Sequence, residues 1–182
     1  MYKAKICVVG PCEGGKTLLS NFLGDQTDII NSTYKPTAGV RILEFENLVE
    51  SRNNNSVKVD VELWDCSGNE NLESCWPAMA HRADGVIIVF DPAVTRTSPS
   101  VEAFYNFFVT NQKLKPGNCL LFANSRSKEN RNIPSPLPNV QTITSNFENK
   151  SDEIQNAFQK LLEKILVKLS DSRDKEELSI IS

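Results

Sequence analysis

The residues best suited to chemistry lie near the start of the chain, in the stretch Gly10-Pro11-Cys12-Glu13-Gly14-Gly15-Lys16-Thr17. They fit the pattern G-x-x-x-x-G-K-[ST], in which backbone N–H groups surround a phosphate, a lysine neutralises its charge and a hydroxyl binds Mg²⁺. The apolar run at 4–9 predicts a buried strand before the stretch, and residues 18–23 predict a helix after it. Because the pattern falls between strand and helix, it predicts a phosphate-binding loop; the alternative is an ordinary glycine-rich turn.

Two side chains of this predicted loop are expected to contact the phosphates and the metal ion. Lys16 is expected between the β- and γ-phosphates, which also makes it a candidate catalytic residue, and the Thr17 hydroxyl is expected to bind Mg²⁺. The other expected contacts to the nucleotide come from Gly10, Pro11, Cys12, Glu13, Gly14, Gly15 and Leu18.

Two further patterns follow in an order that suits the same chemistry. Residues 57–63 alternate as a strand and lead into Trp64-Asp65-Cys66-Ser67-Gly68-Asn69-Glu70. Asp65 could hold Mg²⁺ through water, and the backbone N–H of Gly68 could approach a γ-phosphate. Earlier, Tyr34-Lys35-Pro36-Thr37 precedes the predicted second strand, where Thr37 could bind Mg²⁺ only when a third phosphate is present. Each short pattern is weak alone, but their order and spacing predict Thr17, Thr37 and Asp65 as metal ligands.

Bulk properties restrict the classes of protein. The 182 residues suit one domain, and the net charge of −3 argues against general attraction to nucleic acid or anionic lipid. Five cysteines, an odd number, predict reduced thiols in the cytosol. Apolar runs stay below the ~18 residues of a membrane span. No targeting presequence is expected, because a predicted strand begins almost at once, and no lipid anchor is expected, because no cysteine follows Cys119.

The order of predicted elements indicates the fold class. Strands are expected near 3–9, 39–46, 57–64, 85–91, 118–124 and 140–144, and helices near 16–23, 70–82, 98–112 and 151–169. Such alternation predicts an α/β protein with a mostly parallel six-stranded sheet and helices on both faces. Residues 53–56 are expected to close a hairpin between the second and third strands. We expect one nucleotide-binding domain over 1–170, then a polar tail over 171–182.

Together these motifs resemble those of the Ras-like small GTPases over nearly the whole chain. Trp64-Asp65-x-x-Gly68 is similar to the second switch of that superfamily, and Tyr34-x-Pro36-Thr37 is similar to the first. Within the superfamily, the chain is most similar to the Rab-like protein 5 family, also called the intraflagellar transport protein 22 family. That closer resemblance is carried by Gly10-Pro11-Cys12-Glu13-x-Gly15-Lys16-Thr17, Gly39-Val40-Arg41-Ile42-Leu43-Glu44-Phe45-Glu46-Asn47, Glu73-Ser74-Cys75-Trp76-Pro77-Ala78 and Ser172-Arg173-Asp174-Lys175-Glu176-Glu177. We derive no nucleotide chemistry for the two middle blocks.

The resemblance implies a three-layer P-loop small-GTPase fold and GTP or GDP with Mg²⁺ as cofactors. It also implies a subunit of intraflagellar transport complex B that docks to the coiled-coil subunits 74 and 81. Its expected location is the cytoplasm and the cilium or flagellum, including the ciliary base. An actively cycling regulatory GTPase is the alternative. A P-loop small-molecule kinase is disfavoured. Such kinases usually cover the donor phosphates with an arginine-rich lid, and here only Arg126 and Arg131 are candidates for it.

Two departures from the small-GTPase pattern predict slow hydrolysis. Asn69 stands where a glutamine usually orients the attacking water, and its amide would fall about 1.5 Å short, one carbon–carbon bond. Cys12 occupies a position that is often glycine, so its side chain would crowd an arginine finger. The alternative for Asn69 is a solvated loop residue.

The expected base-reading residues depart further from the family pattern. Asn124 fits its place, whereas Ser125-Arg126-Ser127 follow where Lys-x-Asp would be expected. A serine hydroxyl cannot reproduce the paired acceptor that a carboxylate offers to guanine. Ser145 and Asn146 resemble the final loop that contacts the guanine oxygen, so guanine preference is implied mainly by the resemblance.

Two aromatic residues to which we assign no nucleotide chemistry have open interpretations. Trp76-Pro77 is a candidate docking surface for a partner protein, although burial of Trp76 in the core is the stronger expectation. The single histidine, His81, is expected to be an ordinary residue at a helix end, since no acidic or cysteine ligand pattern surrounds it.

Overall fold

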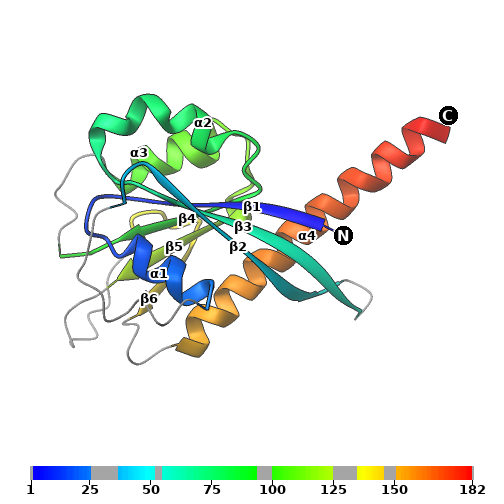
Figure 1. Ribbon diagram of the computed structural model, residues 1–182, viewed down its shortest axis with the longest axis horizontal. Helices are drawn as coiled ribbons and strands as arrows, with labels where there is room; N and C mark the ends of the chain where they lie inside the picture. The colour runs from blue at the N-terminus through cyan, green and yellow to red at the C-terminus, as the bar shows by residue number, and fades with distance from the viewer. Residues whose placement is uncertain are drawn as a thin grey trace.

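The computed structural model describes residues 2–25, 37–51, 55–93, 100–124, 135–145 and 151–181. A six-stranded sheet in the order β2-β3-β1-β4-β5-β6 lies at its centre (Figure 1). The strands are β1 (Tyr2–Val9), β2 (Val40–Glu50), β3 (Ser56–Cys66), β4 (Gly85–Phe90), β5 (Cys119–Asn124) and β6 (Gln141–Ser145). Only the β2–β3 pair is antiparallel, which confirms the predicted mostly parallel sheet.

Helices cover both faces of the sheet, as predicted. They are α1 (Lys16–Leu23), α2 (Trp76–Ala80), α3 (Val101–Tyr105) and α4 (Ser151–Ile181), with short 3₁₀ turns η2 (Glu70–Cys75) and η4 (Pro116–Asn118) and a π-helical segment η3 (Asn106–Thr110). One core lies under α1 and α4, where Leu19 and Phe158 pack with Ile87. The other lies under α2 and α3, where Met79 and Phe104 pack with Ile88 (Figure 1). Successive residues of β4 thus face opposite cores, which is why that strand is apolar throughout.

Helix α4 is longer than the sequence predicts. Apolar residues along one face of the helix are buried from Ile154 to Leu166, and Leu169 packs partly against the same core. The helix then continues to Ile181 and projects beyond the sheet (Figure 1). The expected end near 169 is wrong because the apolar periodicity stops there, while lysine, glutamate, arginine and leucine still favour helix. The division into a domain and a tail at residue 170 stays a prediction.

Two smaller expectations about local structure are confirmed. The β2–β3 hairpin closes where Glu50 pairs with Ser56 and the Ser51 N–H donates to the Asn55 carbonyl at 2.9 Å. His81 lies at the C-terminal end of α2 and is exposed. The helix expected over 70–82 is divided between η2 and α2.

Trp76 belongs to the core under α2 and α3. Its ring centroid lies 4.9 Å from that of Phe104, 5.2 Å from Phe107 and 5.4 Å from Phe108, and the residue is 7% exposed. The stronger expectation for Trp76 is therefore confirmed, and its alternative as a docking surface is wrong.

Two further findings concern the state of the cysteines and the presence of membrane-spanning helices. The five cysteines are all free, and Cys7, Cys66 and Cys119 are buried. Among the helical residues that the structure describes, no stretch is both long enough and apolar enough to cross a membrane.

Candidate nucleotide and magnesium site

Loop 10–17 connects β1 to α1 at the carboxyl ends of the parallel strands (Figure 1). Gly10 has φ 138° and Gly15 has φ 98°, conformations that side-chain-bearing residues rarely adopt. A Cβ on Gly10 would strike the Val89 carbonyl, and one on Gly15 would strike the Asn124 amide. The two glycines of the sequence pattern are thus required by backbone conformation and by the neighbouring strands β4 and β5.

Lys16 is buried inside this loop. Its Nζ donates to the carbonyls of Gly10 at 2.9 Å and Pro11 at 2.7 Å, and the residue is 7% exposed. Burial lowers the pKa of Lys16, while the nearby charges of Cys12 and Asp65 oppose that shift. An ammonium group kept in such a desolvated place interacts with a phosphate more strongly than one in water.

The three expected metal ligands lie together beside Lys16. Thr17 Oγ1 is 2.9 Å from Thr37 Oγ1, and the Thr37 hydroxyl donates to Asp65 Oδ2 at 3.4 Å. These residues come from α1, from the segment before β2, and from the end of β3. Parallel and antiparallel pairing of β1, β2 and β3 therefore brings together residues 20 to 48 positions apart in sequence.

The Asp65 carboxylate is poorly satisfied by protein groups alone. Its side chain is completely buried, and its Oδ1 has no hydrogen-bond partner among the described residues. Burial raises the pKa of Asp65, against the hydroxyl of Thr17 and the guanidinium of Arg41. A buried carboxylate oxygen beside two hydroxyls suits Mg²⁺, which takes one or two carboxylates and completes its octahedron with phosphates and water. The residues present therefore fit the ion. Within the described ranges, this site included, no group of three His, Cys, Asp or Glu side chains could hold a metal.

Gly68 lies directly against loop 10–17. A Cβ there would be 2.6 Å from Cys12 N, Gly10 O and Lys16 Nζ. Real Cβ atoms do not approach backbone atoms this closely, so a larger residue would push the two loops apart. The segment after β3 is thus in contact with the loop and its lysine.

Asn69 is exposed and occupied with local structure. It caps η2, its Oδ1 accepting the Asn71 N–H at 3.0 Å. Such a cap holds the amide at the start of the 3₁₀ turn. Cys12 is also exposed.

Part of the expected base-reading region can be located. Asn124 ends β5, is 6% exposed, and its Nδ2 donates to the Gly14 carbonyl at 3.1 Å. Ser145 ends the neighbouring strand β6 and pairs with Asn124 in the register. Ser125, Arg126, Ser127 and Asn146 lie outside the described residues. Asn124 and Ser145 therefore lie at the carboxyl ends of the parallel strands, on the same side of the sheet as loop 10–17.

Two residues that the sequence analysis gave no role belong to this cluster. Arg41 Nη2 lies 3.4 Å from Asp65 Oδ2 and donates to Asn21 Oδ1 at 2.6 Å. Arg41 pairs with Asp65 across β2 and β3. The hairpin predicted over 53–56 would not have found this pair, because the observed pairing of Glu50 with Ser56 centres the hairpin on residue 53.

Comparisons with known proteins agree with this geometry. Residues 5–127 match the family model described as "Ras of Complex, Roc, domain of DAPkinase". The chain is 44% identical to the intraflagellar transport protein 22 homologue of Danio rerio and 42% identical to that of Homo sapiens, with both chains covered completely. It is 29% identical to intraflagellar transport protein 22 of Trypanosoma brucei brucei, over 89% of this chain and 85% of that protein.

A solved structure is similar over almost the whole fold. It is described as the T. brucei IFT22/74/81 GTP-bound crystal structure. The matching chain superposes with a TM-score of 0.72 at 28% identity, over 94% of this chain and 99% of that one. With its full-length relatives and its Ras-like domain, the chain belongs to the intraflagellar transport protein 22 family.

Proposed function

We propose that this protein is a GTP- and GDP-binding subunit of intraflagellar transport complex B, which binds Mg²⁺ with its nucleotide and docks to coiled-coil subunits 74 and 81. The observation that carries the proposal is the grouping of Thr17, Thr37 and the buried Asp65 carboxylate beside the buried Lys16. The partners come from the T. brucei relative, whose structure holds IFT22 with 74 and 81 in a GTP-bound state. The working location is the cytoplasm and the cilium or flagellum.

Loop 10–17 would enclose the phosphates. In this proposal its backbone N–H groups point to the β-phosphate, Lys16 moves from the Gly10 and Pro11 carbonyls to the phosphate oxygens, and Thr17, Thr37 and Asp65 hold Mg²⁺. The ion would neutralise charge on the β- and γ-phosphates. Asn124 would brace the loop near the base, and guanine selection at 125–127 and 145–146 stays a proposal supported by the relatives.

Hydrolysis would be slow in the isolated chain. The Asn69 amide accepts a backbone N–H from Asn71, so it is held at the cap of η2 and is also shorter than a glutamine. We expect single turnover at or below about 10⁻⁴ s⁻¹, the range of an unassisted small GTPase. Asn69→Gln should raise the rate, with Cys12→Gly added if the cysteine crowds the site. Rapid hydrolysis by the wild-type chain would favour the cycling GTPase instead.

In this proposal, Thr37 and Gly68 make the conformation of the protein depend on the presence of a third phosphate. Thr37 contacts Thr17 and Asp65, and Gly68 contacts loop 10–17, so a γ-phosphate would touch the segments before β2 and after β3 at once. A triphosphate would then order a surface that a partner reads, and the partner would favour that state only if it binds the two states differently.

The deciding experiment titrates the coiled-coil pair 74/81 against the full chain loaded with a non-hydrolysable GTP analogue, loaded with GDP, or free of nucleotide. The triphosphate form should bind most tightly. Thr37→Ala should reduce the preference, and Thr110→Ala, an exposed threonine on η3, should leave it unchanged. Failure to bind either nucleotide would overturn the proposal, and equal affinities in the three states would leave a constitutive structural subunit in place of a switch.

A further inference from the structure

Arg41 is the one charged side chain on β2 that reaches the candidate magnesium site. Glu46, on the same strand, does not reach the site and pairs instead with Lys58 at 2.6 Å on the exposed part of the hairpin. Arg41 instead spans from the buried Asp65 carboxylate to Asn21 on α1. Its side chain is 34% exposed, yet its Nε is buried and has no hydrogen-bond partner within the part of the chain that the structure describes.

In this position, Arg41 would compete with a bound metal ion for the Asp65 carboxylate. The guanidinium and Thr37 both approach the same oxygen, Asp65 Oδ2. A Mg²⁺ ion held by Thr17, Thr37 and Asp65 would share that carboxylate with a fixed positive charge. The guanidinium remains protonated under all ordinary conditions, so its charge cannot be relieved by losing a proton.

Two opposite effects on ligands follow from Coulomb's law. The Arg41 charge repels a divalent cation and occupies part of its carboxylate, so it weakens binding of Mg²⁺. The same charge makes the neighbourhood of the phosphates more positive when Mg²⁺ is absent, so it strengthens binding of the nucleotide alone. Both effects reduce the extent to which nucleotide binding depends on the ion.

We propose that Arg41 is a positioning residue that acts as a resident cation beside Asp65 and makes nucleotide binding less dependent on Mg²⁺. The inference rests on the proposed nucleotide-binding function. It differs from a purely structural role, in which Arg41 only braces β2 against α1 through Asn21. A brace would alter binding equally with and without the ion.

The test measures the Kd for GDP and for a non-hydrolysable GTP analogue in excess Mg²⁺ and in excess chelator. The quantity of interest is the ratio of the Kd in chelator to the Kd in Mg²⁺. Arg41→Gln removes the charge and keeps a donor for Asn21. It should raise the ratio at least about fivefold, the low end of typical coupling between two ligands. Arg41→Lys should give an intermediate ratio, and Lys58→Gln, on the exposed hairpin, should leave it unchanged.

The outcomes separate the inference from the function beneath it. An unchanged ratio in Arg41→Gln, including equal weakening in both conditions, would overturn the inference and leave nucleotide binding intact. Absence of binding by the wild-type chain in both conditions would overturn both. The wild-type ratio is a second measurement that needs no variant. It should stay below about 150-fold, the high end of such coupling, and a larger ratio would overturn the inference.

Discussion

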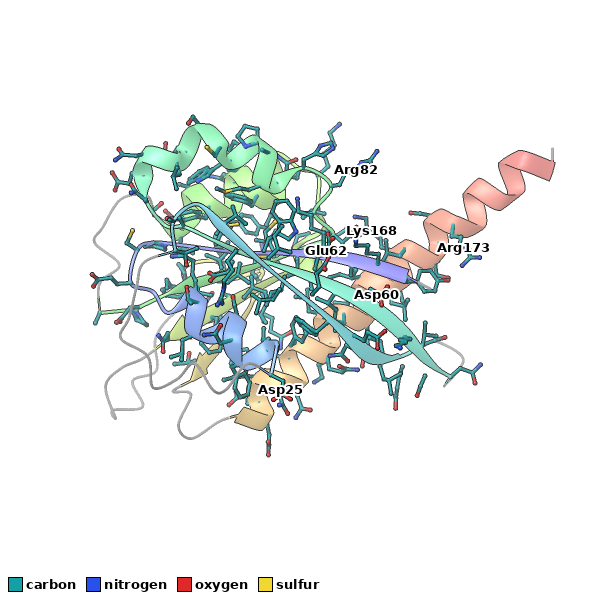
Figure 2. All side chains as sticks on the ribbon, viewed as in Figure 1. Asp25, Asp60, Glu62, Arg82, Lys168 and Arg173 are labelled. Carbon is teal, nitrogen blue, oxygen red and sulfur yellow. The ribbon has the colours of Figure 1, made fainter. Side chains whose placement is uncertain are left out.

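Charged residues at the candidate magnesium site and on the exposed part of the β2–β3 hairpin are partnered in opposite ways. On the hairpin and its neighbour β1, Lys58 pairs with Glu46 and Lys3 pairs with Glu62, each at 2.6 Å and each with substantial exposure to water. At the site, Asp65 is completely buried and Arg41 Nη2 lies 3.4 Å from its Oδ2. Figure 2 shows Glu62 and Asp60 along β3, with Asp60 on the side toward the projecting end of α4.

The difference separates charges that suit water from charges that suit a ligand. Exposed pairs contribute about 0–1 kcal/mol because water already solvates both partners. A buried polar atom without a partner costs about 1–3 kcal/mol, and Asp65 Oδ1 has none among the residues that the structure describes. The hairpin charges keep an edge strand soluble, since β2 is at the end of the sheet order. The unpartnered oxygen of Asp65 reduces stability, and the proposed magnesium ion would offset that cost.

The largest expected effect tests the buried side of this comparison. Lys16→Ala should weaken binding of GDP and of a GTP analogue by at least about 30-fold, because truncating one member of a buried charge pair costs about 2–5 kcal/mol. Isothermal titration calorimetry would measure both affinities. Lys58→Ala removes the same charge from the exposed hairpin and should bind as wild type does. If Lys16→Ala holds nucleotide as tightly as the wild-type chain, the phosphate-binding interpretation is wrong.

The second prediction compares the two regions by their response to pH. Burial raises the pKa of Asp65, whereas the hydrogen bond and charge of Lys3 lower the pKa of Glu62. A raised native pKa means that the folded chain holds the Asp65 proton more tightly, so stability falls as pH rises above about 3.9, the usual aspartate value. A lowered native pKa means that Glu62 stabilises the fold above about 4.3, the usual glutamate value, and that this stability is lost as pH falls through its native pKa.

The two neutral variants should therefore diverge. Relative to wild type, Asp65→Asn should gain free energy of unfolding as pH rises from about 4 to about 7, whereas Glu62→Gln should lose it as pH rises from about 3 to about 5. Urea unfolding of the nucleotide-free chain in chelator, at several pH values, would measure both. The prediction is contradicted if the free energy of unfolding relative to wild type changes with pH in the same direction for the two variants.

The sequence predicted the parts of this site that depend on local patterns. Loop 10–17 needs Gly10 and Gly15 for their backbone conformations, and those glycines are visible in the motif. Asp65 and Gly68 follow a strand whose alternation is clear. The packing of α4 was equally predictable, because its apolar residues recur on one face.

The parts that the sequence missed depend on contacts between distant elements. Arg41 meets Asp65 because the hairpin sets the register of β2 and β3, and it meets Asn21 because α1 packs on the same face. No local pattern marks either contact. The helical continuation of α4 was missed for a different reason, since helix propensity without an apolar stripe gives no periodic signal. The aromatic cluster around Trp76 likewise joins α2 to α3 and η3.

The smallest expected effect tests the exposed side of the comparison. A double-mutant cycle with Lys58→Ala and Glu46→Ala should give a coupling free energy below about 1 kcal/mol, despite the 2.6 Å separation of the charged atoms. Both side chains are more than half exposed, so water solvates them when the pair is broken. The coupling should fall further at about 1 M salt, where screening acts within about 3 Å. Urea unfolding at low and high salt would measure it. A coupling of several kcal/mol that persists at high salt would mean that a short exposed pair on the hairpin stabilises the fold, and that distance, more than burial, decides what a charge contributes in this protein.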